Sequence, residues 1–387
     1  MKQSWDIKKL RDVIVENRKS TLKSKGNFEG DFPFFISGKT IKTINISIID
    51  GDNIYLPTGG NFYIHYYSGK ASYSTDTWSL RTNSSADIKY FFYFLLLNEN
   101  IIGEKHFKGA TIKHLQKNDF KEIEFPIPPR PEQQHIVSIL DECFAAIDKA
   151  KANAEQNLLN AKELFESYLK TAFENKVHGE RFESLDNLCE LIVDCEHKTA
   201  PTQEIGYPSI RTPNIGKGEL ILENVNRVSY ETYLQWTRRA VPKSGDLILA
   251  REAPAGNIAV IPENIEVCLG QRTVLLRPKK DRLVSKYLAY LILSKEVQEI
   301  LLSHSTGATV QHINMKDIRA FKIYDLSDLK EQIAVVHKLD SLRAETQKLE
   351  AIYQKKIDDL DELKKSILQK AFAGELKTEI KVFAEQV

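Results

Sequence analysis

Residue patterns that support catalysis are incomplete in this chain of 387 residues. Gly38-Lys39-Thr40 has the ending of a phosphate-binding loop, but Pro33 stands where that pattern needs its first glycine. Gly216-Lys217-Gly218 lacks the third glycine of a dinucleotide-binding fingerprint. The sequence also has no Asn- or Asp-Pro-Pro-aromatic tetrapeptide, which marks the active site of amino-methylating methyltransferases. We therefore expect a chain with no active site of its own.

Side chains suited to reading the edges of DNA bases are more frequent. Arg, Lys, Asn and Gln offer the paired hydrogen-bonding groups that match bases in the major groove. The candidates in the N-terminal region, which has Gly/Ser/Thr-rich turns, are Lys39, Thr40, Lys42, Thr58, Asn61, Tyr73 and Thr75. The candidates in the second region are Lys198, Arg211, Asn214, Lys217, Arg238, Arg239, Arg251, Gln271 and Arg272.

Some of these residues have a structural interpretation as well. Arg251 stands where an apolar run gives way to a Pro/Gly-containing loop, which favours a functional role. Arg238-Arg239 follows Trp236 and fits a solvated charged turn equally well. Gln271-Arg272 lies between apolar runs and also fits a buried polar pair. Phosphate contacts only position a DNA-binding protein, whereas base contacts specify the sequence, and the residue types alone do not separate the two.

Charge supports localised contacts with DNA and argues against indiscriminate coating of nucleic acid. The net charge is only +1. Residues 1–128 carry 18 Lys and Arg against 14 Asp and Glu, and residues 197–280 carry 12 against 8. Two mildly basic regions are compatible with local phosphate contacts.

An internal repeat organises the chain, and repeats indicate the fold before any other signal. The segment Gly-Ala-Thr-Ile-Lys-His-Leu at 109–115 returns as Gly-Ala-Thr-Val-Gln-His-Ile at 307–313, an offset of 198. Glu132-Gln133 and Leu140-Asp141 return 199 residues later. A weaker match near the start has an offset of 178, so the second copy is longer by about 21 residues. The repeat predicts a duplicated unit with similar ends and different middles.

Each copy ends in a segment that predicts a long helix. Neither 132–175 nor 330–373 contains Gly or Pro, and apolar residues recur in steps of four and three. This seam includes Ile136, Leu140, Ile147 and Leu164 in the first copy, and Leu339, Leu342, Leu349, Leu360 and Leu363 in the second. Polar Asn157 and Lys356 fall on the same seam and would fix its register. A core helix of a globular domain has a similar stripe, but the length and duplication favour an antiparallel coiled coil within the chain.

These helix entries carry a family resemblance. Pro126-Ile127-Pro128-Pro129-Arg130-Pro131-Glu132-Gln133, followed by Ile136 and Leu140-Asp141, resembles the central region of specificity subunits of type I restriction-modification systems. Lys330-Glu331-Gln332 with Leu339-Asp340 resembles the distal copy, although it lacks the proline entry. The Gly-Ala-Thr turns at 109–111 and 307–309 resemble the turn that closes each recognition domain. Segments 194–197, 210–215 and 245–251 are similar to patterns common in these domains.

The resemblance implies an α+β fold with two mixed α/β target-recognition domains, separated by two long antiparallel coiled-coil helices in a pseudo-twofold repeat. The expected segments are 1–128 and 179–326 for the recognition domains, 129–178 for the central helix, and 327–387 for the distal helix and tail. Each domain would read one half of a split double-stranded DNA target. The helices would bind methyltransferase subunits, two of them, and through these the restriction subunits. S-adenosylmethionine, ATP and Mg would be used by the other subunits and not by this chain. The open alternative is a coiled-coil protein-binding adaptor without DNA specificity.

Cysteine usage and hydropathy indicate the compartment. Cys143, Cys189, Cys195 and Cys268 have no paired spacing, which favours a reducing environment over a disulfide framework. Cys189, Cys195 and His197 lack a fourth ligand at a zinc-binding spacing, so we expect no metal. No apolar run reaches the roughly 18 residues that cross a membrane. We expect a cytoplasmic protein.

Overall fold

The computed structural model describes residues 5–26, 29–174, 176, 178–252, 255–303 and 312–376. The chain forms two compact units, residues 1–155 with 354–387, and residues 156–353. The two long helices are α4 (Arg130–Phe173) and α10 (Leu329–Phe372), and each contributes residues to both units. Residues 307–309, the second copy of the Gly-Ala-Thr turn, lie outside the described residues.

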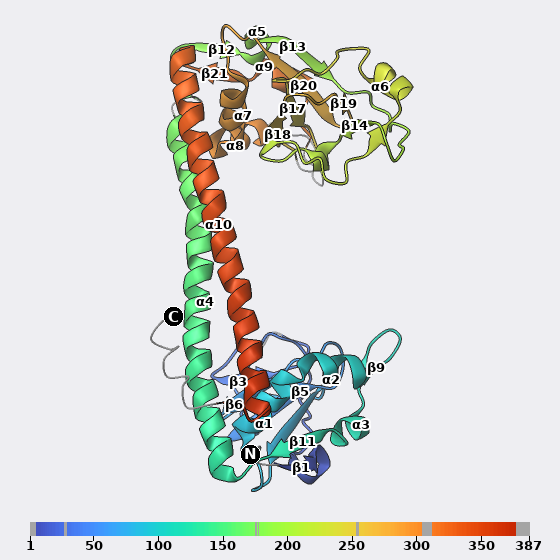
Figure 1. Ribbon diagram of the computed structural model, residues 1–387, viewed down its shortest axis with the longest axis vertical. Helices are drawn as coiled ribbons and strands as arrows, with labels where there is room; N and C mark the ends of the chain where they lie inside the picture. The colour runs from blue at the N-terminus through green and yellow to red at the C-terminus, as the bar shows by residue number, and fades with distance from the viewer. Residues whose placement is uncertain are drawn as a thin grey trace. The chain divides into compact units, whose positions relative to one another are not determined.

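The first domain, which runs from β1 to β11 in the first unit, is built on two main sheets (Figure 1). One has the order β2-β8-β5-β6 and consists of β2 (Ile14–Glu16), β8 (Thr77–Thr82), β5 (Asp52–Pro57) and β6 (His65–Ser68). The other has the order β4-β3-β7 and consists of β4 (Lys42–Ile44), β3 (Phe32–Phe35) and β7 (Ser72–Tyr73). Short strand pairs join β1 (Asp6–Lys9) to β11 (Glu124–Ile127) and β9 (Phe107–Lys108) to β10 (His114–Leu115). The helices are η1 (Leu10–Asp12), α1 (Ile88–Leu97), α2 (Glu99–Lys105) and α3 (Lys117–Lys121).

The second domain, which runs from β12 to β21, repeats this plan with an extra strand. Its large sheet has the order β13-β20-β17-β18-β15 and consists of β13 (Cys189–Asp194), β20 (Thr273–Pro278), β17 (Leu247–Ala250), β18 (Ile258–Val260) and β15 (Gly218–Glu219). Its small sheet has the order β16-β14-β19 and consists of β16 (Arg227–Val228), β14 (Tyr207–Ile210) and β19 (Cys268–Leu269). β12 (Phe182–Ser184) pairs with β21 (Lys322–Tyr324). The helices are α5 (Leu185–Leu188), η2 (Thr212–Asn214), α6 (Tyr230–Trp236), α7 (Ser285–Leu293), α8 (Lys295–Ser303) and α9 (Met315–Ala320).

Strand register locates the additional residues of the second domain. Eighteen positions separate Ile210 in β14 from Val228 in β16, against nine between Phe35 in β3 and Ile44 in β4. The first of these longer connections carries β15. The next connection is also longer and carries α6. The duplicated frame therefore tolerates insertions on the connections of its small sheet, where surface loops vary at little cost to the core.

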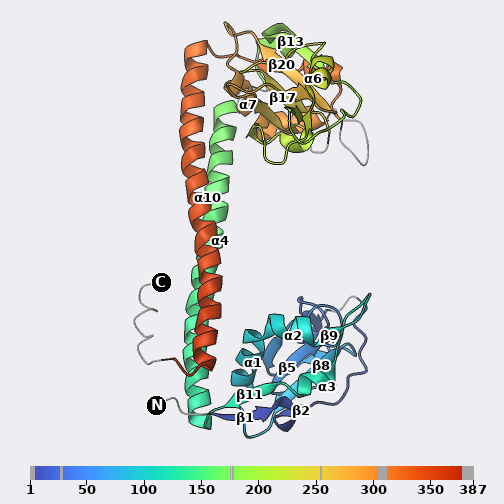
Figure 2. The ribbon, with the colours of Figure 1, turned by 45° about the vertical axis from the view of Figure 1, so that its right-hand side comes forward.

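The core of each unit combines a domain with the beginning of one long helix and the end of the other (Figure 2). In the first unit Phe372, near the end of α10, packs against Tyr90 of α1 with ring centroids 4.9 Å apart. In the second unit Phe173, at the end of α4, packs against Tyr287 of α7 at 5.1 Å. Phe173 and Phe372 are 199 positions apart, so the repeat in sequence is also a repeat in packing.

Charged contacts tie each long helix to its domain in the same way. Asp141 of α4 accepts hydrogen bonds from the Tyr93 hydroxyl and the Lys89 ammonium, both at 2.6 Å. Asp340 of α10 accepts them from Tyr290 at 2.7 Å and Lys286 at 2.8 Å. The recurring Leu-Asp pair of the sequence is thus the point at which each long helix binds its domain.

The helices are antiparallel in the first unit. Lys151 pairs with Asp361 at 2.6 Å and Asp148 with Lys364 at 2.8 Å, so positions rise along α4 as they fall along α10. At the equivalent positions of the second unit, 199 residues away, Glu350 replaces Lys151 and Lys162 replaces Asp361. The charges are exchanged between the helices at this pair of positions, and Lys162 and Glu350 line the same cleft in the second unit. Asp148 and Lys364 instead correspond to the uncharged Gln347 and Phe165.

The buried face departs from a strict heptad. In α4 it passes through Ile136, Leu140, Ile147 and Ala161, and then through Phe165 and Leu169, whereas Leu164 is exposed. In α10 Leu339, Ile357 and Leu360 are buried, Leu342 is half-buried, and Leu349, Lys356 and Leu363 are exposed, as is Asn157 of α4. A straight helix with 3.6 residues per turn drifts by roughly 20° per heptad, so a strict seven-residue repeat leaves the contact face within a few turns.

Among the described residues, no helix combines the length and apolar character that crossing a bilayer requires. The two long helices are strongly charged. The strongly apolar helix α1 has only 10 residues.

Candidate nucleic-acid interface

The topology of the second domain gathers polar side chains at one edge of its small sheet. β14 and β19 are parallel, with Ile210 opposite Leu269, so their carboxyl ends share an edge. Arg211 follows β14 directly, and Gln271 follows β19 after Gly270. Asn226 immediately precedes β16, which is antiparallel to β14, and so lies at the same edge. Figure 1 shows β14, β19 and α6 on the side of this domain away from α10.

These side chains line one small hollow. Its lining consists of Thr199, Ala200, Thr202, Ser209, Arg211, Asn226, Gly270 and Gln271. Gly270 permits the arrangement, because a Cβ atom there would lie 2.4 Å from Cγ of Arg211 and 2.8 Å from the carbonyl oxygen of Ile210. The sequence identified Arg211 and Gln271 as candidates, but it missed Thr199, Thr202 and Asn226. These three residues could have been found only from their positions next to paired strands, and the sequence does not show which strands pair.

Neighbouring cations belong to ion pairs. Glu196 contacts Arg238 at 3.0 Å and Arg239 at 3.4 Å. Arg272 contacts Glu252 at 2.8 Å and has a positive φ of 67°. All three arginines are exposed, so they can still approach a phosphate. The turn interpretation of Arg238-Arg239 and the candidate DNA contacts are therefore compatible. Lys198 is exposed next to His197 and forms no ion pair with a described residue.

Arg251 has internal partners that the sequence interpretation did not anticipate. Its side chain is 7% exposed. It donates to Asp194 at 2.7 Å, to the carbonyl of Ile313 at 2.9 Å, and lies 2.8 Å from Nε2 of His312. The guanidinium is buried and bound to three partners, so it joins the end of β17 to the residues after 311, which disfavours a contact with DNA. The change from an apolar run to a loop indicated where the strand ends. It did not indicate whether the Arg251 side chain points inward or outward.

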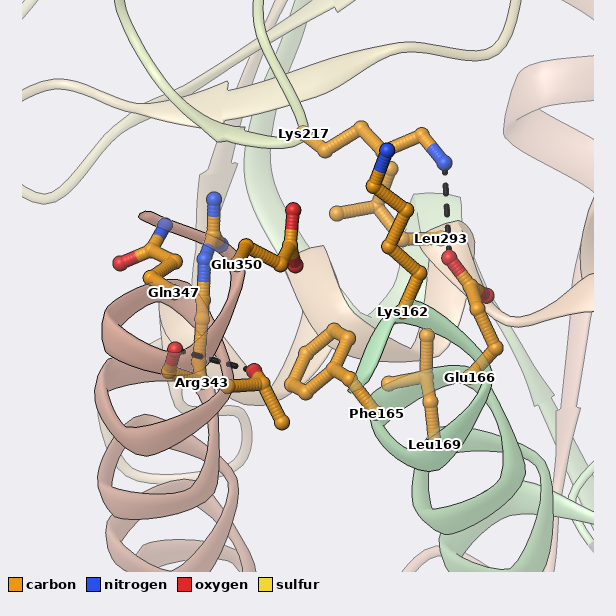
Figure 3. Close-up of a pocket in the computed structure, with 10 residues that line it drawn as sticks. Lys162, Phe165, Glu166, Leu169, Lys217, Leu293, Arg343, Gln347 and Glu350 are labelled. Atoms are coloured by element: carbon orange, nitrogen blue, oxygen red, sulfur yellow. Dashed lines mark hydrogen bonds and ion pairs between the residues drawn. The ribbon is translucent and has the colours of Figure 1, made fainter. Parts of the chain in front are cut away.

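Asn214 and Lys217 also have internal partners. Asn214 accepts from the backbone N–H of Arg211 at 3.2 Å and donates to the carbonyl of Ile221 at 3.3 Å, which holds the turn at η2. Lys217 lies 3.5 Å from Glu166 of α4 (Figure 3). It lines a cleft of about 340 Å³ with Phe165, Arg343 and Glu350, among others. The structure thus places Lys217 against the long helices and away from the hollow.

The first domain uses several of its candidates internally. Tyr73 is 3% exposed, donates to the carbonyl of Arg18, and has a pKa raised by burial. Its ring belongs to the aromatic cluster of Phe35 and Tyr55, which disfavours the expected DNA contact at Tyr73. The Thr58 hydroxyl donates to the carbonyl of Asp76 at 2.9 Å. Thr75 is half-buried.

The remaining first-domain candidates lie on turns. Lys39 and Thr40, between β3 and β4, are exposed, as is Asn61 after β5. Lys42 is half-buried and donates to the carbonyl oxygens of Ser24 and Gly26, each at 3.4 Å. The structure brings Lys39, Thr40 and Lys42 together on one hairpin.

One group of potential metal ligands occurs among the described residues. Asp194, Cys195 and His197 place a ligand atom each within 4.8 Å of one another. Asp194 is shared with Arg251, and burial raises the pKa of the Cys195 thiol, which disfavours the thiolate that metals bind. Cys189, the third residue of the zinc pattern in the sequence, lies instead in the core around α7. These groups fit an ion-pair network better than a zinc centre.

The chain contains a duplicated α/β domain, and each copy is fixed to a long helix. The loops at the edge of the small sheet are polar. These features define a class of protein with two separate domains that each present a polar surface. The family described as "Type I restriction modification DNA specificity domain" matches residues 2–157 and 181–369. The chain belongs to this family.

Relatives and solved structures agree with the match, most of them over nearly the whole chain. The type I restriction enzyme MjaVIII specificity subunit of Methanocaldococcus jannaschii is 25% identical, covering 97% of this chain and 93% of that protein. The EcoBI specificity subunit of Escherichia coli is 26% identical, covering 74% and 66%. A solved chain from a type I R-M system superposes with a TM-score of 0.72 at 20% identity, covering 96% and 98%. The HsdS subunit of Thermoanaerobacter tengcongensis has a TM-score of 0.55 at 19% identity, covering 96% and 97%. The structural likenesses establish the fold.

Proposed function

We propose that this chain is the DNA-recognition subunit of a type I restriction-modification complex and that it reads a bipartite target, one half-site with each domain. The observation that carries the proposal is the duplication itself. Two domains built on the same plan, one with an extra strand, present non-identical loops at equivalent sheet edges, and both belong to the DNA specificity family. Equivalent frames with different loops are suited to reading two different short sequences.

We further propose that the chain is not catalytic and that the segments 1–128, 129–178, 179–326 and 327–387 act as first recognition domain, central helix, second recognition domain and distal region. Exposed apolar residues on the long helices, including Leu159, Leu164 and Ile352, support a role for these helices in binding protein partners. The partners proposed are two methyltransferase subunits and, through them, restriction subunits. S-adenosylmethionine, ATP and Mg would then be bound by those subunits.

An adaptor without DNA specificity is disfavoured, because the family match covers both domains as well as most of each helix. Selective binding to duplex DNA is the property that would distinguish a DNA-recognition subunit from such an adaptor.

Selection of bound duplexes from a randomised library tests this function. The full-length chain, co-purified with its methyltransferase partner, should enrich two short conserved blocks separated by a gap of fixed length and unspecified sequence. Binding to the enriched duplex should weaken linearly on a log–log plot as salt increases, because phosphate contacts release counterions. Enrichment of one uninterrupted block, or of no sequence, would contradict the proposal.

A further inference from the structure

Side chains at the edge of the second domain divide into two groups by their partners. Arg238, Arg239 and Arg272 are each held by a glutamate. The Arg211 guanidinium and the Asn226 amide have no hydrogen bond to any residue within the described part of the chain, and the Gln271 amide has one long contact of 3.4 Å to the carbonyl of His197. A guanidinium that is paired with a carboxylate must share or release that carboxylate before it can form a bidentate contact with a base. Side chains without a hydrogen-bond partner do not have this requirement.

The three side chains with few or no hydrogen bonds also lie close together. Arg211, Asn226 and Gln271 come from three separate segments, yet all line the same hollow with the hydroxyls of Thr199 and Thr202. They are held by the ends of paired strands, which fixes their backbone, and Gly270 lets the Arg211 stem lie close across the β19 turn. Recognition groups placed on rigid element ends are positioned more accurately than groups on free loops.

We infer that Arg211, Asn226 and Gln271 are the base-reading side chains of the second domain, and that the glutamate-paired arginines around them contact phosphates. The inference rests on the proposed function and adds its chemistry. Arginine pairs bidentately with O6 and N7 of guanine, and asparagine and glutamine with N6 and N7 of adenine. The half-site of the second domain therefore contains a guanine and at least one adenine that these residues contact.

The same position exists in the first domain with different residues. Phe34 pairs with Ser72 and Phe35 with Tyr73 in the parallel pair β3–β7, as Ser209 pairs with Cys268 and Ile210 with Leu269 in β14–β19. Ile36 is therefore the counterpart of Arg211, and Thr75 the counterpart of Gln271. The antiparallel partner strands make Lys42 the counterpart of Asn226. The first domain has no guanidinium at this position, so the two half-sites differ in sequence.

The test repeats the library selection with single variants of the full-length chain in its complex. Arg211→Ala, Asn226→Ala and Gln271→Ala are compared with wild type and with Arg282→Ala, a matched charge deletion in the same domain. Arg282 is paired with Glu183, away from the hollow. Gly270→Ala is added because its Cβ atom would displace the Arg211 stem, and with it the adjacent Ile210 carbonyl, while the Arg211 guanidinium is kept. Thermal melting within a few degrees of wild type establishes that each variant is folded.

The expected result is a loss of base preference at one or two positions of one block, by roughly 5- to 150-fold, with the other block unchanged. Gly270→Ala should affect the same position as Arg211→Ala, and Arg282→Ala should keep every preference. A uniform loss of affinity with all preferences retained would show phosphate contacts and overturn the inference, as would unchanged selection. Wild-type protein that selects no split sequence would instead contradict the proposed function, which is a separate outcome.

Discussion

Gln133 and Gln332, 199 positions apart, make the same three hydrogen bonds in the two units. Gln133 accepts from the backbone N–H of Asp87 at 2.6 Å and donates to the carbonyl oxygens of Ser85 and Pro128 at 3.0 and 2.8 Å. Gln332 accepts from Val284 at 2.8 Å and donates to Arg282 and Ser327 at 3.0 and 2.8 Å. Both are fully buried. One amide thus joins the start of each long helix to the segment that enters the domain helix.

Replacing either glutamine with alanine should destabilise its unit. Gln332→Ala leaves the Val284 N–H and two carbonyl oxygens without their partner, and an unsatisfied buried polar group costs about 1–3 kcal/mol. We expect a loss of about 2 kcal/mol in the free energy of unfolding, measured by urea denaturation, and a similar loss for Gln133→Ala. The matched control is Gln134→Ala, because Gln134 is exposed on the same helix. An equal effect of the control would refute this role.

Reversing one charge of the helix pair should weaken it slightly, and reversing both should restore it. Lys151→Glu places a glutamate against Asp361 in the first unit, whereas Lys151→Glu with Asp361→Lys restores opposite charges. Because both side chains are partly exposed, the coupling should be about 0.5 kcal/mol. A double-mutant cycle by thermal or chemical unfolding measures it. Additive effects of the two changes would mean that the ion pair contributes nothing to the pairing of the helices.

Arg251→Ala should act through stability. Removing the guanidinium takes away the buried partner of the half-buried Asp194 and leaves its carboxylate with His197 and the Cys195 N–H, and breaking a largely buried ion pair in this way costs about 3–5 kcal/mol. We expect a loss of about 3 kcal/mol in chemical denaturation and unchanged base preferences in any protein that remains folded. Asp186 and Arg319 form an exposed ion pair in the same domain, so Arg319→Ala provides a comparison with a small expected effect. A stable Arg251→Ala variant with altered base preference would restore the sequence interpretation.

Lys198→Ala should weaken DNA binding without altering specificity. Lys198 is exposed on the loop that also carries Thr199 and Thr202. Loss of one phosphate contact should reduce the slope of log affinity against log salt by about 1 and lower affinity to all sequences alike. Fluorescence anisotropy across a salt series on selected and scrambled duplexes measures both quantities. An unchanged slope would exclude a phosphate contact, and a loss confined to the selected duplex would make Lys198 a base contact.

The frame of this protein could be predicted from sequence because its signals are repeated. The Glu-Gln and Leu-Asp pairs recur at one offset, and in the structure their Gln and Asp side chains fix the long helices to the domains. The capping residue of α10 was less visible, since Ser327 and Asp328 stand side by side before the helix. In the structure Asp328 accepts the hydrogen bond from the N–H of Glu331 at 2.9 Å. Serine and aspartate are both favoured caps, so one residue of uncertainty in the helix start decides between them.

The candidate interface was less predictable. Residue type identified Arg211 and Arg251 equally, but burial separates them, because strand pairing turns Arg251 inward and leaves Arg211 exposed. Asn226 was missed because its position depends on the antiparallel pairing of β16 with β14, which is a long-range property. The heptad pattern predicted the buried positions Leu140 and Leu339 correctly, but it also predicted Leu164 and Leu363, which are exposed. A straight helix rotates slightly with each heptad, so a strict seven-residue pattern fails after several turns.

We expect this chain alone to decide which DNA sequence its complex modifies. The most direct measurement is genome-wide mapping of methylated adenines in cells that express the methyltransferase partner with or without this chain. We expect a split motif, two short blocks with a fixed gap, that is methylated when the chain is present and unmethylated when it is absent. A set of methylated motifs that does not change with the chain, despite a stable complex with the partner, would contradict it.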